Sequence, residues 1–180
     1  GNSPDVTGVF DVASIGLTQM ATNLNHGRDI GDSPLAPPTG ILIGVGVNPC
    51  AVEKKLELDR FRAKIDAGAE YAITQPIFDP DDLLQFMDEI SKFPVTIPIV
   101  AGVWPLTSFK NAEFMKNEVP GVEVPDNVLE RMSKCKSKED GWKTGGEIAR
   151  NTCSRLTDSV AGFQVSAPFG KVDLAINVLA

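Results

Sequence analysis

Apolar and polar positions alternate along the chain in blocks that predict strands followed by helices. The run Ile41–Val47, "ILIGVGV", is continuously apolar and follows a loop rich in Pro and Gly, so it predicts a strand buried on both faces. Residues 51–67 have helical composition with one apolar stripe, and Gly68 stands where a helix C-cap glycine is expected. A second strand is predicted at Tyr71–Gln75.

The same alternation continues to the end of the chain. Asp79 and Pro80 predict the N-cap and the first residue of the next helix. Further strands are predicted at 95–103 and 162–167, and further helices at 12–25, 106–119, 127–135, 139–160 and 172–179. Strands separated by helices in this way predict a parallel α/β sheet. We find no linker, so we expect a single domain over residues 1–180.

Composition and charge disfavour several classes of protein, among them nucleic-acid-binding and membrane-spanning proteins. The chain has 180 residues, 42% of them hydrophobic, and a net charge of -7, which is typical of a soluble globular domain and disfavours nucleic acid as a partner. No apolar run approaches the roughly 18 residues of a membrane span. Cys50, Cys135 and Cys153 fit neither a disulfide framework nor a metal knuckle, so we expect free thiols, a cytoplasmic location and no metal site.

Unusual polar residues stand where the predicted strands end. Asn48 follows the first strand, and Thr74 and Gln75 end the second. In parallel α/β folds the carboxyl ends of the strands form the ligand face. A glutamine amide offers one donor and one acceptor side by side, which suits the polar edge of a flat heterocycle. The alternative is an amide that only caps the neighbouring loop.

Three longer motifs lie at these strand ends and in the loops. They are "AGAEYAITQPIFD", "AGVWPLTSFKNAEFM" and "VPGVEVPDNVLERM", and together they resemble the methylenetetrahydrofolate reductase family over essentially the whole chain. "GVGVNP" and "GFQVSAPFGKVDLA" look closest to the reductase portion of the bifunctional homocysteine S-methyltransferase/5,10-methylenetetrahydrofolate reductase proteins. The resemblance implies a (β/α)8 barrel, of which four strands here would form the C-terminal half.

The resemblance also implies a reaction. Family members bind FAD and, with electrons from NADH, NADPH or ferredoxin, reduce 5,10-methylenetetrahydrofolate to 5-methyltetrahydrofolate in one-carbon and methionine metabolism. The acid that protonates the folate would lie in the missing N-terminal half, so no catalytic residue is assigned here. Open sheet edges would need that half or a second copy of the chain, so we expect a homo-oligomer or a complementary partner.

Individual site residues are carried over from the family motifs. Gln75 matches the glutamine that contacts the pterin, and Phe109 matches an aromatic that packs on the folate; its alternative is a helix-face core residue. At the end of the last strand, some family members have a basic residue at the position that Phe169 occupies here. We expect the nearby Lys171 to take its place in binding the substrate. The flavin contacts implied are Asn2, where the family usually has Asp, and Val12, Ala13, Asn48, Glu57, Arg60 and Lys64. Lys64 could instead be a solvated helix charge.

Two other functions remain open at this point. One is a non-catalytic folate- or flavin-binding module, favoured by the unassigned acid and by Asn2. The other is an unrelated α/β enzyme with Schiff-base or phosphate chemistry. Schiff-base chemistry would need a lysine at a strand end, but Lys64 is in mid-helix. Phosphate binding would need a Gly-rich loop, but "GVGVNP" runs into proline. His26, the only histidine, stands in the polar stretch "LNHGRD", which disfavours a catalytic triad or a histidine metal site.

Overall fold

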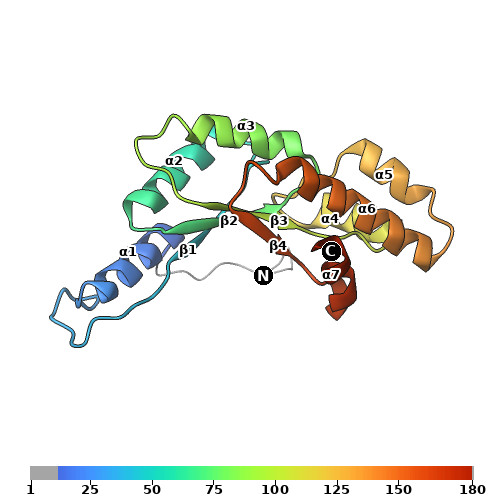
Figure 1. Ribbon diagram of the computed structural model, residues 1–180. Helices are drawn as coiled ribbons and strands as arrows, with labels where there is room; N and C mark the ends of the chain where they lie inside the picture. Colours follow the sequence, from blue (N-terminus) through green and yellow to red (C-terminus); the bar gives the residue numbers. More distant parts are fainter. Residues whose placement is uncertain (1–11, 180) are drawn as a thin grey trace.

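Four parallel strands form one sheet, with helices between them in the chain (Figure 1). The computed structural model describes residues 12–179, so Asn2 lies outside the described residues. The strands are β1 (Gly44–Val47), β2 (Tyr71–Pro76), β3 (Ile99–Val103) and β4 (Gly162–Val165), paired in the order β1-β2-β3-β4. The helices are α1 (Ser14–Asn25), α2 (Lys54–Asp66), α3 (Pro80–Ile90), α4 (Phe109–Glu118), α5 (Asp126–Ser133), α6 (Lys138–Leu156) and α7 (Val172–Leu179), with a short 3₁₀ helix, η1 (Pro168–Gly170).

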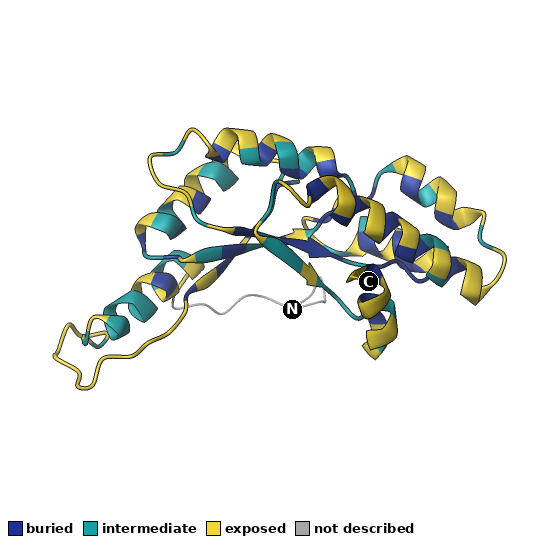
Figure 2. Ribbon diagram, viewed as in Figure 1, coloured by how far each residue is buried: buried dark blue, intermediate teal, exposed yellow. Residues whose placement is uncertain are grey.

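This arrangement confirms the predicted α/β class and agrees with part of a (β/α)8 barrel. Helices α2, α3 and α6 lie along one face of the sheet (Figure 1), and their sheet-facing sides are buried (Figure 2). The main core joins strand residues such as Val47 and Ala101 to Phe61, Leu83 and Leu156 of these helices. A second core lies between α4, α5 and the loop after β3.

The opposite face of the sheet is accessible to solvent. Its side chains come from alternate positions of the strands, and all are exposed or half-buried: Gly44, Gly46, Tyr71, Ile73, Gln75, Val100, Gly162 and Gln164. We call this set the open face. The expectation that β1 is buried on both faces is therefore wrong, because Val45 and Val47 are buried but Gly44 and Gly46 are exposed. In the part of the chain that the structure describes, no second layer covers this face.

Most element ends follow their local sequence signals. Asp79 accepts a hydrogen bond from the backbone N–H of Asp81, with Pro80 as the first helical residue, as predicted. Ser108 caps α4 by accepting a hydrogen bond from the backbone N–H of Asn111. β3 begins at Ile99 and not at the predicted Val95, since Pro98 has no N–H to donate to a ladder. Within residues 12–179, no helix is both long and apolar enough to cross a membrane.

Candidate ligand-binding face

Gln75 lies on the open face at the carboxyl end of β2. The ladder between β2 and β3 shifts register between Ile73 and Pro76. The Thr74 hydroxyl fills the irregularity: its Oγ accepts from the Gly102 N–H at 2.9 Å and donates to the Gln75 carbonyl at 2.7 Å. The Gln75 side chain is exposed, and within the described residues it makes no hydrogen bond to a loop, as the capping alternative would require. Its amide is therefore available to a ligand.

Glycine at position 102 makes this irregularity possible. A Cβ atom there would lie only 2.4 Å from the Thr74 carbonyl oxygen, a distance that real Cβ atoms do not reach. Gly102 thus lets β3 approach the bulged end of β2 closely. Gln75 continues the alternation of Tyr71 and Ile73, so its side chain lies on the open face at the strand end where the register shifts.

Phe109 stands at the first position of α4, just after the loop that follows β3. The buried Asn111 organises this loop, because its Oδ1 accepts from Trp104 Nε1 at 3.4 Å and from the Thr107 N–H at 3.2 Å. Ser108 then caps the helix through the Asn111 N–H. Phe109 itself is 38% exposed, so the alternative of a buried core residue is wrong.

Lys171 follows η1, in the turn after β4. Its Nζ lies 4.6 Å from the centre of the Trp142 ring on α6, and Lys138 Nζ lies 4.8 Å from the same ring. Phe169 adopts a left-handed conformation (φ 55°) and is 77% exposed. Because Phe169 carries no charge, the basic side chain in this turn is that of Lys171.

The predicted flavin contacts on α2 are tied to the end of β1. Glu57 Oε1 accepts from the Asn48 N–H at 2.9 Å, and Lys64 Nζ donates to the Gly46 carbonyl at 2.7 Å. Lys64 is only 7% exposed, so it is not a solvated helix charge, and burial lowers its pKa. Arg60 is exposed and is free to reach a ligand.

Val12 and Ala13 are exposed and stand immediately before α1. Between α1 and residues 41–46 lies a groove of about 320 Å³ that runs along β1. Ile43 accepts a hydrogen bond from the Glu70 N–H on the β2 side, so by alternation the Gly46 carbonyl points to the free edge of β1. Lys64 therefore satisfies a carbonyl at an edge that has no strand partner in the described residues.

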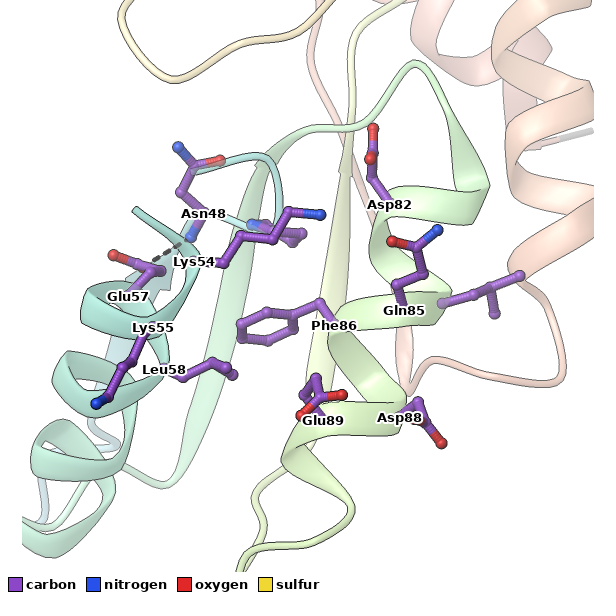
Figure 3. Close-up of a pocket in the computed structure, with 12 residues that line it drawn as sticks. Asn48, Lys54, Lys55, Glu57, Leu58, Asp82, Gln85, Phe86, Asp88 and Glu89 are labelled. Atoms are coloured by element: carbon purple, nitrogen blue, oxygen red, sulfur yellow. Dashed lines mark hydrogen bonds between the residues drawn. The ribbon is translucent and has the colours of Figure 1, made fainter. Parts of the chain in front are cut away.

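A larger groove, of about 760 Å³, lies between α2 and α3 (Figure 3). Lys54 and Asp82 stand on its opposite walls, with Leu58 and Phe86 between them. Although Asn48 and Glu57 also line it, it lies in the helix layer, and Gln75, Phe109 and Lys171 are not among its lining residues. This groove is therefore separate from the open face.

Cys50 lies near the same groove, with Sγ 3.6 Å from Asp82 Oδ2. Burial, reinforced by the Asp82 carboxylate, raises the pKa of the Cys50 thiol to about 12. A thiol with so high a pKa is a poor nucleophile near neutral pH. Among the described residues, no group of three or more His, Cys, Asp or Glu side chains is placed to hold a metal ion.

The sequence was also compared with models of known protein families, and the match covers most residues of the open face. Residues 46–166, which include the Gln75 bulge and the Phe109 loop, match the model of the family described as methylenetetrahydrofolate reductase. The chain belongs to the methylenetetrahydrofolate reductase family.

Named relatives of this reductase family match parts of the chain. A probable methylenetetrahydrofolate reductase (NADPH) of Caenorhabditis elegans is 28% identical over 113 residues, which are 62% of this chain and 17% of the relative. The 5,10-methylenetetrahydrofolate reductase of Buchnera aphidicola is 39% identical over 80 residues, or 44% of this chain and 26% of the relative. The chain thus spans about a fifth of the length of such relatives.

One solved structure supports the fold. It is an uncharacterized protein from Clostridium thermocellum that binds two copies of 5-methyl-5,6,7,8-tetrahydrofolic acid. The likeness has a TM-score of 0.53 at 19% identity, and it covers 80% of this chain and 53% of that one. At this identity the likeness shows a shared fold, and nearly half of the neighbour extends beyond it.

Family motifs predict Gln75 and Phe109 as site residues, but they do not predict the residues that position them. In the sequence, Asn111 stands out only as one residue of the "PLTSFKNAEFM" motif. Its hydrogen bonds with Trp104 and Thr107 are seen only in the structure. Trp142 was also missed, although Lys138 stands four positions before it, the spacing of neighbours on one helix face.

Proposed function

We propose that the chain is part of a flavin-dependent enzyme that reduces 5,10-methylenetetrahydrofolate to 5-methyltetrahydrofolate. The observation that supports this proposal is the exposed amide of Gln75 on the open face, next to the Thr74–Gly102 hydrogen bond and within the family-matched residues. A pterin edge alternates donors and acceptors, and a glutamine amide can pair with it through one of each.

The substrate then extends across the open face in this proposal. Gln75 holds the pterin at the end of β2, and Phe109 offers an exposed ring to the next part of the folate. Ser108 and Asn111 fix the start of α4, so the ring is presented from a rigid helix end. No residue among those described is assigned as the acid, so protonation of the folate would fall to a group outside them.

FAD is assigned to the free edge of β1, beside the open face. A Cβ on Gly46 would meet nothing within 4 Å, so a flat ring can approach the backbone of β1 there without a steric barrier. Val12, Ala13, Asn48 and Arg60 are the residues that we assign to this cofactor, with Glu57 and Lys64 fixing the backbone beside it. When bound, FAD supplies hydride transfer from a nicotinamide donor to the folate.

The donor is proposed as NADH or NADPH. The Caenorhabditis elegans relative is named for NADPH and a rice relative for NADH, so the donor is kept at the level of NAD(P)H. We also propose that residues 1–180 are one domain, the C-terminal part of a reductase barrel of the kind fused to homocysteine S-methyltransferase. The motifs "GVGVNP" and "GFQVSAPFGKVDLA" support this assignment.

The open edges of β1 and β4 support a partner. We propose that either a complementary N-terminal half-barrel or a second copy of the chain pairs with them. The second candidate function, a non-catalytic folate- or flavin-binding module, is favoured by the absence of an assigned acid among residues 12–179.

Spectroscopy on the protein joined to its N-terminal half separates the two functions. If the joined protein is a reductase, its flavin absorption should be bleached by NAD(P)H and restored by 5,10-methylenetetrahydrofolate. The isolated chain should bind FAD weakly, because the contacts to FAD come from both halves of the barrel. Absorption that is bleached but not restored by the folate would favour the binding module. A joined protein that binds neither FAD nor folate would contradict both functions.

A further inference from the structure

The end of β2 contains one residue more than the strand beside it. Between its last two register pairs with β3, β2 advances three residues and β3 advances only two. Pro76 is the local cause, because it has no N–H to donate to the ladder, and the next N–H, that of Ile77, donates to the Gly102 carbonyl at 2.9 Å. The sequence itself therefore places a bulge at this point of β2.

The hydroxyl of Thr74 joins the two strands across this bulge. A hydroxyl has one proton to donate, and Thr74 Oγ accepts from the Gly102 N–H at 2.9 Å while it donates that proton to the Gln75 carbonyl at 2.7 Å. Gly102 is thus attached to β2 twice, through its N–H by Thr74 and through its carbonyl by Ile77. Gln75 lies between these two attachments in the sequence, so its main chain has little freedom to shift.

Thr74 cannot itself touch a ligand on the open face. Its side chain is only 5% exposed, and it alternates with Ile73 and Gln75, which lie on the open face. The Gln75 side chain is exposed. The buried hydroxyl can therefore influence a ligand on the open face only through the neighbouring residue that it holds.

We propose that Thr74 is a positioning residue whose hydroxyl fixes the main chain of Gln75, so that the side-chain amide meets the pterin edge with donor and acceptor aligned. This inference rests on the proposed function. Because a paired amide contact needs both hydrogen bonds at the right distance, a small shift of the Gln75 backbone weakens both at once. The alternative is a threonine that only satisfies the buried N–H of Gly102.

Stopped-flow reoxidation of the reduced complete reductase by 5,10-methylenetetrahydrofolate tests this role. Thr74→Val replaces the hydroxyl by a methyl group, and Thr74→Ala removes it without placing a new group against Gly102. Both should slow reoxidation about 2- to 10-fold, the range of one hydrogen bond, with flavin content unchanged. Thr74→Ser keeps the hydroxyl and should restore the rate to nearly that of the wild type.

Thr152→Val is the matched control. Thr152 is a buried threonine on α6 whose hydroxyl donates within its own helix, to the Ile148 carbonyl at 3.2 Å. Its substitution should lower the urea midpoint without slowing reoxidation. A loss of stability alone is thereby separated from a loss of positioning at Gln75.

Combining Thr74→Ala with Gln75→Ala distinguishes positioning from a structural role. If Thr74 acts through the amide, removing its hydroxyl should slow reoxidation in the wild type but not further in Gln75→Ala, since no amide remains to be aligned. Equal slowing in both backgrounds overturns the inference, and so does a wild-type rate in Thr74→Ala. A wild-type rate in Gln75→Ala alone would instead contradict the proposed function, and the inference with it.

Discussion

At the scale of single residues, the environment of Gln75 depends on contacts that are distant in sequence. An exposed amide at the end of a strand was predictable from the motif. The register shift beside it was not predictable, because it depends on a hydrogen bond between Thr74 and Gly102, which are 28 positions apart. Site residues set by such long-range contacts can be found from a family motif but not explained by it.

Lys64 was predicted as a flavin contact, with a solvated helix charge as the alternative, and its buried side chain excludes that alternative. Burial lowers its pKa from the ordinary 10.5, with Arg60 acting in the same direction and Glu57 against it. Between the lowered value and 10.5 the folded state therefore releases its proton first, and the unfolded state binds more protons. The stability contributed by this position must rise with pH across that window.

Lys64→Met isolates this effect from other titrations. We expect the free energy of unfolding of the wild type, measured relative to Lys64→Met by urea titration, to increase as the pH rises from 7 towards 10.5. The matched variant Lys55→Met, on an exposed position of the same helix, should show no such trend. A difference between wild type and Lys64→Met that stays flat or falls with pH would show that Lys64 is not held charged in a buried position.

At the scale of elements, capping residues predicted where helices begin and end, whereas helical composition did not predict how the helices pack. The caps Asp79 and Gly68 follow from local chemistry, and they begin α3 and follow α2 as the sequence predicts. Two adjacent glycines, Gly145 and Gly146, lie within α6. Their surroundings differ sharply, which no helical pattern reveals because the contact comes from the loop after β3.

Gly145→Ala and Gly146→Ala form a matched pair that tests this contact. A Cβ on Gly145 would lie 1.8 Å from the Leu106 carbonyl oxygen, whereas a Cβ on Gly146 would have its nearest neighbour at 3.6 Å, in Arg150. We expect Gly145→Ala to destabilise the protein by about 1–3 kcal/mol through overpacking. Gly146→Ala should stabilise it by up to about 1 kcal/mol through helix propensity.

Urea unfolding of both variants measures the two changes. Equal effects of the two substitutions would mean that α6 does not dock its first turns on the loop that carries Phe109, and the described position of that loop would be wrong.

At the scale of the whole molecule, the chain exposes more surface than a compact protein of its mass. Its accessible area is 10769 Å², against roughly 8500 Å² for a folded monomer of 19.3 kDa. The open face and the free edges of β1 and β4 agree with this excess. The parallel order of the strands was predictable from the alternation of elements, but the one-sided burial of β1 was not, because it depends on what covers the sheet.

The isolated chain should therefore self-associate through its sheet edges. An unpaired strand edge flanked by the exposed Leu17 and Leu42 is a template for pairing with another chain. Multi-angle light scattering at micromolar concentration should give a mass above 19.3 kDa. Lysine substitution at Leu42 should lower that mass, whereas lysine at the exposed Val52, in the loop before α2, should not. A monomer with a cooperative melt would show that the chain protects its own edges.

The central claim is that Gln75 recognises the folate, and one rate tests it most directly. In the complete reductase, stopped-flow absorbance should follow reoxidation of the reduced protein by 5,10-methylenetetrahydrofolate. Gln75→Ala should slow this step roughly 5- to 150-fold, because unpaired pterin groups cost about 1–3 kcal/mol. Flavin content should stay constant, and Gln85→Ala, an exposed amide on α3, should behave as wild type. A wild-type reoxidation rate in Gln75→Ala would remove Gln75 from the folate site and contradict the account.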